Sequence, residues 1–225
     1  MFDKVTKSIR VISAAAVERA NSGHPGMPMG MAEVGTVLFK NALKISNKQP
    51  DWTNRDRFVL SAGHGSMLLY SLLHFNNFDI SIEDIKQFRQ LDSKTAGHPE
   101  VDTSLGIDIT TGPLGQGFAT GVGLALAESY LSEVLGKDII NHYVYGIVSD
   151  GDLMEGISFE AAELAGVWKL GKLIYIFDDN NISIDGSVDK VSITDQKKKF
   201  ESFGWQVLEI DGHNEIEIKN AIDIS

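Results

Sequence analysis

The residues best suited to chemistry lie in two acidic segments, 149–156 and 178–186, each of which directly follows an apolar run. The first reads Ser-Asp-Gly-Asp-Leu-Met-Glu-Gly and the second reads Asp-Asp-Asn-Asn-Ile-Ser-Ile-Asp-Gly. Carboxylate, amide and backbone carbonyl oxygens are hard ligands that suit Mg²⁺ or Ca²⁺, and such an ion can also hold a phosphorylated cofactor. The two segments together predict a site for a divalent cation and a phosphate group.

The apolar runs at residues 143–148 and 173–177 predict two strands, and residues 158–170 predict a helix between them. This order is that of a βαβ unit, whose parallel strands deliver Asp150 and Asn180 to the same edge of a sheet, where open α/β folds bind ligands. A short acidic-glycine motif also occurs in plain turns, so the motif alone leaves an ordinary turn open.

Histidine placement adds a second candidate feature, because four of the six histidines directly follow a glycine. They are His24, His64, His98 and His213. Residues 23–30 contain three Gly and two Pro, which predicts an irregular loop around the first of these histidines. Histidines in loops favour function over a role in the core, although a loop histidine with satisfied hydrogen bonds stays a structural alternative.

Two glycine-rich stretches are expected to approach a ligand closely. Residues 57–61 predict a short buried strand that runs into Gly63-His64-Gly65, just before a helix at 67–75. Glycines here favour contact between backbone N–H groups and an anion such as a diphosphate, though a tight turn would also use them. The second stretch, 110–117, leads into a long helix at 116–135 and lacks the Gly-Lys-Ser/Thr ending of a P-loop.

The remaining periodicity completes an alternating pattern of helices and strands. Helices are predicted at 3–20, 31–44, 82–91 and 195–203 and after Asn214, and a further strand is predicted at 205–210. The pattern predicts an α/β fold, doubly wound, with a mostly parallel sheet and helices on both faces. No internal repeat or linker marks a second domain, so residues 1–225 are interpreted as one domain.

Composition excludes several classes of function. The formal net charge of −11 argues against binding to nucleic acid or to an anionic membrane surface. The absence of cysteine excludes disulfides and thiolate chemistry. No apolar run reaches the roughly 20 residues that span a bilayer, and the N-terminus lacks the pattern of a signal peptide, so a cytoplasmic setting is expected.

Residues 150–158, with Gly171-Lys172-Leu173-Ile174 and Asp178-Asp179-Asn180, resemble the thiamine diphosphate signature and transketolases in particular. The loop at 23–26 and the Gly-Pro-Leu-Gly-Gln-Gly of 112–117 resemble the same family. Ser149 and Asn181 stand where the family usually has Gly; a small side chain should permit the first turn, and Asn tolerates a left-handed backbone at the second. The similarity covers the whole chain but only the first third of a usual transketolase.

The resemblance implies roles for individual residues. Asp150, Asn180 and the backbone carbonyl of Ile182 would coordinate Mg²⁺, Ca²⁺ or another divalent cation that bridges the cofactor's diphosphate. His24 and His98 would be catalytic residues that face the substrate. The residues that would contact thiamine diphosphate, or support its site, are His64, Gly112, Leu114, Asp150, Gly151, Glu155, Asn180 and Ile182.

The resemblance also implies a function. The family transfers a two-carbon ketol unit from a ketose phosphate to an aldose phosphate, and its complete enzymes are homodimers with Glu155 near the dimer interface. Residues 1–225 would be the diphosphate-binding domain, incomplete at its C-terminus, with the pyrimidine-binding and C-terminal domains absent. The pyrimidine-binding domain would belong to the same longer chain or to a separate subunit. Alone, this chain is expected to be inactive, with an association-prone surface that includes Gly117 and Gly121.

Two alternatives remain open at this point. A different thiamine diphosphate enzyme, of the dihydroxyacetone synthase or deoxyxylulose-phosphate synthase type, would use the same metal motif. A non-catalytic module that binds Mg²⁺ and a phosphate ligand would also fit the residues. Specific uptake of thiamine diphosphate over adenine nucleotides would distinguish such a module from an enzyme.

Overall fold

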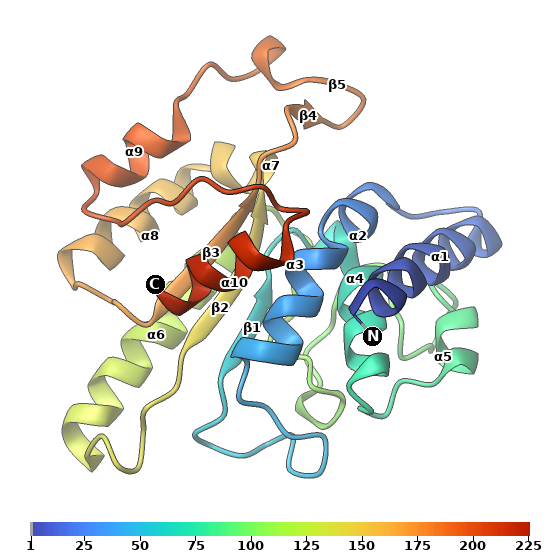
Figure 1. Ribbon diagram of the computed structural model, residues 1–225, viewed down its shortest axis with the longest axis horizontal. Helices are drawn as coiled ribbons and strands as arrows, with labels where there is room; N and C mark the ends of the chain where they lie inside the picture. The colour runs from blue at the N-terminus through green and yellow to red at the C-terminus, as the bar shows by residue number, and fades with distance from the viewer. Residues whose placement is uncertain (1) are drawn as a thin grey trace.

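A three-stranded parallel sheet in the order β1-β2-β3 organises the chain (Figure 1). The strands are β1 (Arg57–Leu60), β2 (Val144–Ser149) and β3 (Leu173–Asp178). This computed structural model describes residues 2–225. Each strand is a short apolar run that ends at small or acidic residues, as the sequence predicts, and the crossovers between parallel strands carry the helices.

Helices cover both faces of the sheet, which confirms the predicted doubly wound α/β class. The first face carries α1 (Phe2–Ala20), α2 (Gly26–Gly30), α3 (Ala32–Val37), the π-helical turn η1 (Leu38–Ala42), α4 (Ser66–Phe75), α5 (Ile82–Lys86) and α10 (Glu215–Asp223). The second face carries α6 (Gln116–Leu135), α8 (Gly156–Val167) and α9 (Gln196–Ser202). The short elements are the 3₁₀ turns η2 (Gly63–Gly65), η3 (Thr103–Leu105) and η4 (Val188–Lys190), the helix α7 (Asp150–Met154), and the hairpin of β4 (Ile182–Ser183) and β5 (Gly186–Ser187).

Alternation along the strands divides the core in two. Tyr145 and Ile147 of β2 pack with the helices of the first face, whereas Val144 and Val148 pack with α6 and α8 on the second. Successive side chains of a strand point to opposite faces, so one central strand serves both cores. Within residues 2–225, no helix combines the length and apolar character needed to cross a membrane.

Two predictions in the N-terminal half of the chain need correction. Residues 23–30 are not wholly irregular, because α2 begins after Pro25 and buries Met27 and Pro28. Proline is tolerated in the first turn of a helix, where no backbone N–H is needed, so the composition is compatible with this short helix. The helix predicted at 82–91 ends at Lys86, although a capping box between Ser81 and Asp84 stabilises its first turn.

Residues 205–210 do not form the predicted strand, because they pair with no strand in the part of the chain that the structure describes. The segment is separated from β3 by a groove, so neither can supply the other's backbone hydrogen bonds.

The surface role expected for Gly117 and Gly121 is also wrong. A Cβ atom at Gly117 would lie 2.5 Å from the Cα of Ser61, and one at Gly121 would lie 2.0 Å from the hydroxyl oxygen of Tyr175. Both glycines let α6 pack closely onto the sheet of this domain.

Candidate functional site

The two acidic segments leave the sheet side by side. Ser149 at the end of β2 is the register partner of Asp178 at the end of β3, so Asp150 and Asn180 follow neighbouring strands at the same edge. Ser149 has an extended backbone, with φ −118°, which needs no glycine. Asn181 has φ 59°, the left-handed conformation that asparagine was expected to tolerate.

Asp150 is a buried carboxylate without a neutralising partner. Its side chain is 6% exposed and accepts no hydrogen bond from another described residue. Burial raises the pKa of Asp150 to about 6, with the charges of Asp179 and Asp178 acting in the same direction. A divalent cation would supply the positive charge that this cluster of carboxylates lacks, so the residues fit the cation that the sequence predicts.

Asn180 is held in place by its neighbours in the turn after β3. Its Oδ1 accepts a hydrogen bond from the backbone N–H of Ile182 at 2.9 Å, and its Nδ2 donates to Asp178 at 3.1 Å. Cα atoms of α7, which Asp150 begins, lie within 8 Å of Cα atoms of β4, which Ile182 begins. Among residues 2–225, no three His, Asp or Glu side chains form a metal site, so this set would rely on amide and carbonyl oxygens.

Asp152 differs from Asp150 although only one residue separates them. It is fully buried and accepts hydrogen bonds from Ser61 Oγ at 2.8 Å, from the backbone N–H of Gly115 at 2.9 Å and from that of Ser149 at 3.1 Å. Asp152 therefore joins the end of β1, the start of α6 and the end of β2. This role was not predicted from the sequence, although the spacing from Ser149 to Asp152 is that of a capping box.

The structure brings His24, His64 and His98 together. The rings of His24 and His64 meet edge to face with centroids 5.2 Å apart. A Cβ atom on Gly112 would lie 3.3 Å from the ring of His98, so that imidazole lies against the glycine-rich stretch. Burial lowers the pKa of His64, and the charges of His24 and His98 lower it further. The imidazole of His64 is therefore biased toward the neutral form, which can both donate and accept a hydrogen bond.

The glycine-rich stretches meet backbone to backbone beside these histidines. A Cβ on Gly63 would lie 2.7 Å from Thr111 Oγ1 and 2.8 Å from the backbone nitrogen of Gly112, and Gly112 itself has φ 152°. Leu114 packs on Gly151, where a Cβ would lie 3.0 Å from the leucine side chain. These glycines therefore allow neighbouring segments to pack closely beside His64 and Asp150. The backbone of both glycine-rich stretches therefore lies beside His64.

Arg89 also contributes to the candidate site, although it was not predicted from the sequence. Its Nη1 donates to Ser22 Oγ at 3.0 Å, and Cβ atoms at Gly97 and Gly23 would lie 3.1 and 3.5 Å from its Nε. The guanidinium thus lies between the two Gly-His-Pro loops. Burial lowers the pKa of His98, and the charge of Arg89 lowers it further. No pattern in the sequence marks this residue, because its contacts come from two distant loops.

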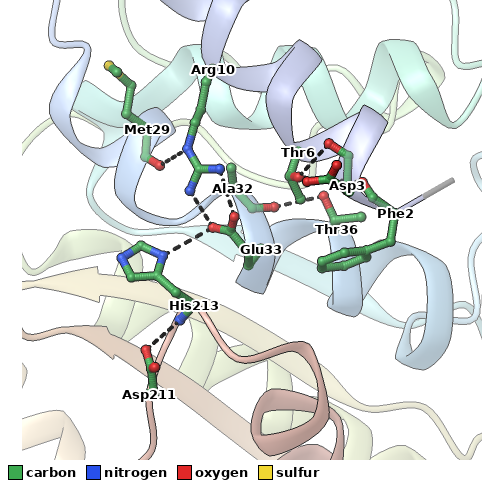
Figure 2. A network of polar contacts seen from close by, with 10 residues as sticks. All are labelled: Phe2, Asp3, Thr6, Arg10, Met29, Ala32, Glu33, Thr36, Asp211 and His213. Carbon is green, nitrogen blue, oxygen red and sulfur yellow. Dashed lines mark hydrogen bonds and ion pairs between the residues drawn. The ribbon is translucent and has the colours of Figure 1, made fainter.

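Glu155 and His213 lie outside the histidine cluster. Glu155 is exposed just before α8. Figure 2 shows His213 in a separate network, where its Nδ1 lies 3.2 Å from Glu33 and Arg10 donates two hydrogen bonds to the same carboxylate. Burial acts to raise the pKa of Glu33, but the hydrogen bonds from Arg10 and His213 outweigh it and lower the pKa. This network joins α1 and α3 to the segment before α10.

Comparison with known proteins gives one consistent result. A family model described as transketolase, thiamine diphosphate binding domain, matches residues 2–225. The transketolase of Bacillus subtilis is 53% identical over 98% of this chain and 34% of its own length, and transketolase 1 of Escherichia coli is 52% identical over the same shares. The crystal structure of the Campylobacter jejuni transketolase aligns with a TM-score of 0.96 at 49% identity, over 99% of this chain and 35% of that one. The chain thus spans about a third of the length of these relatives.

Proposed function

Because this chain belongs to the transketolase family, as its thiamine diphosphate-binding domain, we propose that it is part of an enzyme that transfers a two-carbon ketol unit from a ketose phosphate to an aldose phosphate. The observation that carries the proposal is that the acidic strand ends, the two glycine-rich stretches and the histidines meet at one edge of the sheet. The full-length relatives named transketolase support it over the other thiamine diphosphate enzymes.

Thiamine diphosphate, when bound, supplies a nucleophilic carbon and an electron sink for cleavage of a carbon–carbon bond. In our proposal, Asp150, Asn180 and the carbonyl of Ile182 hold a divalent cation against the diphosphate. The three ligands are a carboxylate, an amide oxygen and a backbone carbonyl. Of these, only the buried carboxylate of Asp150 carries a charge, so it attracts the cation most strongly. The oxygen-only set favours Mg²⁺ or Ca²⁺ over softer metals.

The remaining site residues bind and orient. His64, with the backbone of Gly112, Leu114 and Gly151, contacts the cofactor. His24 and His98 face the sugar, where their imidazoles donate hydrogen bonds to its hydroxyl groups and move a proton. Glu155, exposed before α8, lies free to contact a second subunit.

The chain is proposed to work as the leading part of a larger assembly. Residues 1–225 form the diphosphate-binding domain, incomplete at its C-terminus, and the pyrimidine-binding and C-terminal domains come from the same longer chain or from another subunit. The complete enzyme is a homodimer in the cytoplasm that acts on sugar phosphates. The lengths of the relatives support this reading, because they are about three times that of the chain.

A coupled assay of ketol transfer tests the function. With Mg²⁺ and thiamine diphosphate present, residues 1–225 alone should be inactive, and activity should return when the complementary part of the polypeptide is added. In the complete enzyme, His64→Ala should weaken cofactor binding more than His98→Ala, whereas His98→Ala should mainly lower kcat. Robust activity of residues 1–225 alone, or equal effects of the two substitutions, would contradict the division of roles.

Calorimetry separates the enzyme from a non-catalytic module that binds Mg²⁺ and a phosphate ligand. The complete protein should take up thiamine diphosphate in the presence of Mg²⁺ and should not take up adenine nucleotides. Asp150→Asn should abolish the dependence on Mg²⁺, while Asp185→Asn, a matched change in the exposed hairpin turn, should leave it intact. Equal uptake of both ligands would favour the module.

A further inference from the structure

The side chain of Arg89 contacts both of the loops that carry the proposed sugar-facing histidines. Its Nη1 donates a hydrogen bond to Ser22 Oγ at 3.0 Å, two residues before His24. A Cβ atom on Gly97, directly before His98, would lie 3.1 Å from the Nε of Arg89 and 3.2 Å from its Cζ. One guanidinium group therefore lies within contact distance of both histidine loops.

The two loops are attached to the rest of the domain in different ways. The loop of His98 has two anchors on α4, where the hydroxyl groups of Ser66 and Tyr70 donate to its backbone carbonyl oxygens at 2.9 and 2.8 Å. Within the part of the chain that the structure describes, the only side-chain hydrogen bond to residues 22–25 comes from Arg89. Arg89 therefore supplies the polar contact that fixes the first loop against the second.

The backbone of Arg89 has a conformation that is uncommon for a bulky residue. Its φ is 61°, in the left-handed region that glycine and asparagine tolerate best. Its N–H donates to the carbonyl oxygen of Thr95 at 2.9 Å, so the turn after α5 closes onto the start of the His98 loop. A long cationic side chain at a position that suits glycine indicates that the side chain itself is needed there.

We propose that Arg89 is a positioning residue of the candidate site: by joining the two Gly-His-Pro loops, it fixes the separation and orientation of His24 and His98. The inference rests on the proposed function, in which these two histidines face the sugar. Arg89 acts through the loops and takes no direct part in the transfer of the ketol unit. Because a misplacement of about 1 Å can cost about 100-fold in rate, a contact that fixes two such groups bears directly on turnover.

The charge of Arg89 also acts on His98. Burial lowers the pKa of His98, and the charges of Arg89 and His24 act in the same direction. Removal of the Arg89 charge should therefore raise the pKa of His98, so that this imidazole takes up a proton at higher pH. The other groups that face it are His64 of η2, the uncharged stretch 110–117 and Tyr70 of α4, whose pKa burial raises.

Steady-state kinetics of the complete enzyme test the proposal. Arg89→Met should lower kcat by about 10-fold or more, while the KM for thiamine diphosphate should change by less than about 2-fold because the diphosphate is bound elsewhere. The acidic limb of the pH profile of kcat/KM should move to higher pH. Arg89→Lys keeps the charge but not the planar fork, so it should keep the wild-type limb and recover only part of kcat.

Arg19→Met is the matched control. The Nε of Arg19 also joins the end of α1 to α5, but it donates to the carbonyl oxygen of Lys86, at 3.0 Å, rather than to a histidine loop. The control should keep kcat within about 2-fold of the wild type, with an unmoved pH profile. Equal losses of kcat in the Arg89→Met and Arg19→Met variants would overturn the proposal. An acidic limb that stays in place in Arg89→Met would also overturn it, since a guanidinium group beside the His98 loop must act on that imidazole.

Ser22→Ala keeps the proposal testable if Arg89→Met does not fold. This change removes the hydrogen bond to the His24 loop and leaves the charge of Arg89 in place, so kcat should fall by about 3- to 10-fold with an unmoved pH profile. Unchanged kcat would overturn the proposal. Absence of ketol transfer in the wild-type complete enzyme would instead refute the proposed function. The role of Arg89 is then decided by a crystal structure of Ser22→Ala, in which residues 22–25 should shift by about 1 Å relative to α4 and an unmoved loop would overturn the inference.

Discussion

The candidate site has two unlike halves. Around the histidines, backbone packs against backbone, whereas the segment after β3 is exposed to solvent. In the histidine half, which comprises His24, His64, His98 and the glycine stretches around them, a Cβ on Gly63 would lie 2.7 Å from Thr111. In the hairpin half, residues 178–188, Asn180 is exposed and Ile184 is fully exposed. Both halves supply proposed ligands for the same cofactor.

The difference shows which contacts residues 2–225 can complete by themselves. The histidine half is fixed by Asp152, which ties three segments together beneath it. The side chain of Asn180 in the hairpin half makes only local hydrogen bonds within its turn. Burial, with the charge of Asp179 acting in the same direction, raises the pKa of Asp178 and of Asp150. We therefore expect the histidine half to open only when the whole domain unfolds, whereas the hairpin half should depend on the bound cation and cofactor for its order.

Asp152→Ala should produce the largest loss of stability of the substitutions that distinguish the two halves. The substitution leaves three donors without an acceptor, two of them buried, so the free energy of unfolding should fall by about 3–5 kcal/mol. Urea denaturation measures the change. Asp152→Asn should lose less because its amide oxygen still accepts, and Asp185→Asn in the hairpin half should change stability by less than about 0.5 kcal/mol. Equal losses at Asp152 and Asp185 would remove the distinction between the halves.

Acid should destabilise the sheet beneath the histidine half through His142. Burial lowers the pKa of this side chain to about 4, with the charges of Arg57, Lys172 and Arg55 acting in the same direction. In the unfolded chain the pKa is about 6.5, so the unfolded state binds more protons between these values. Stability is therefore full above pH 6.5 and falls by about 3 kcal/mol as the pH drops to 4.

The measurement is urea denaturation of the wild type and His142→Gln from pH 7 to pH 4. The His142→Gln variant should not show the loss of about 3 kcal/mol that protonation of His142 causes in the wild type. Burial raises the pKa of Asp150 to about 6, so this carboxyl group makes stability rise as the pH falls, opposite to His142. Both proteins contain Asp150, so its effect cancels in the difference between their stabilities at each pH. Parallel curves for the two proteins would show that His142 is not responsible.

Gly117→Ala should lower stability by about 2 kcal/mol, because a methyl group there would meet the backbone of Ser61 at 2.5 Å. Gly123→Ala on the same helix meets nothing within 4 Å and should raise stability by up to about 1 kcal/mol. Both changes remove a glycine from α6, so thermal denaturation of the pair isolates the packing. If both variants gain stability, the close approach of α6 to β1 does not limit the fold.

Ile184→Gly should have the smallest effect and should act within the hairpin half alone. Ile184 has φ 62°, a conformation that costs a β-branched residue about 1–2 kcal/mol. Hydrogen exchange in the hairpin should slow by about 5-fold, while the global free energy of unfolding should change by less than about 0.5 kcal/mol. Ile193→Gly, at an exposed position without positive φ, is the control. A global gain of 1 kcal/mol would show that the two halves unfold together.

Much of the fold follows from local patterns. Apolar runs that end in glycine or acidic residues predict β1, β2 and β3, and residues 116–135 are found as the predicted helix. These predictions succeed because the periodicity and the boundary signals lie within each segment. Residues 205–210 show the limit of this reasoning, because a strand also needs a neighbour for its hydrogen bonds and none is present among residues 2–225.

The sequence by itself determined the family, the parallel α/β class and the placement of Asp150 and Asn180 at the ends of neighbouring strands. Only the tertiary structure decided that Asp150 stays without a partner while Asp152 becomes a structural acceptor, and that Arg89 lies between the two histidine loops. The physical reason is that the donors and the burial come from Ser61, Gly115 and Ser22, which lie far away in the sequence. Charge and hydrogen bonding at each position depend on neighbours that the folded chain alone brings together.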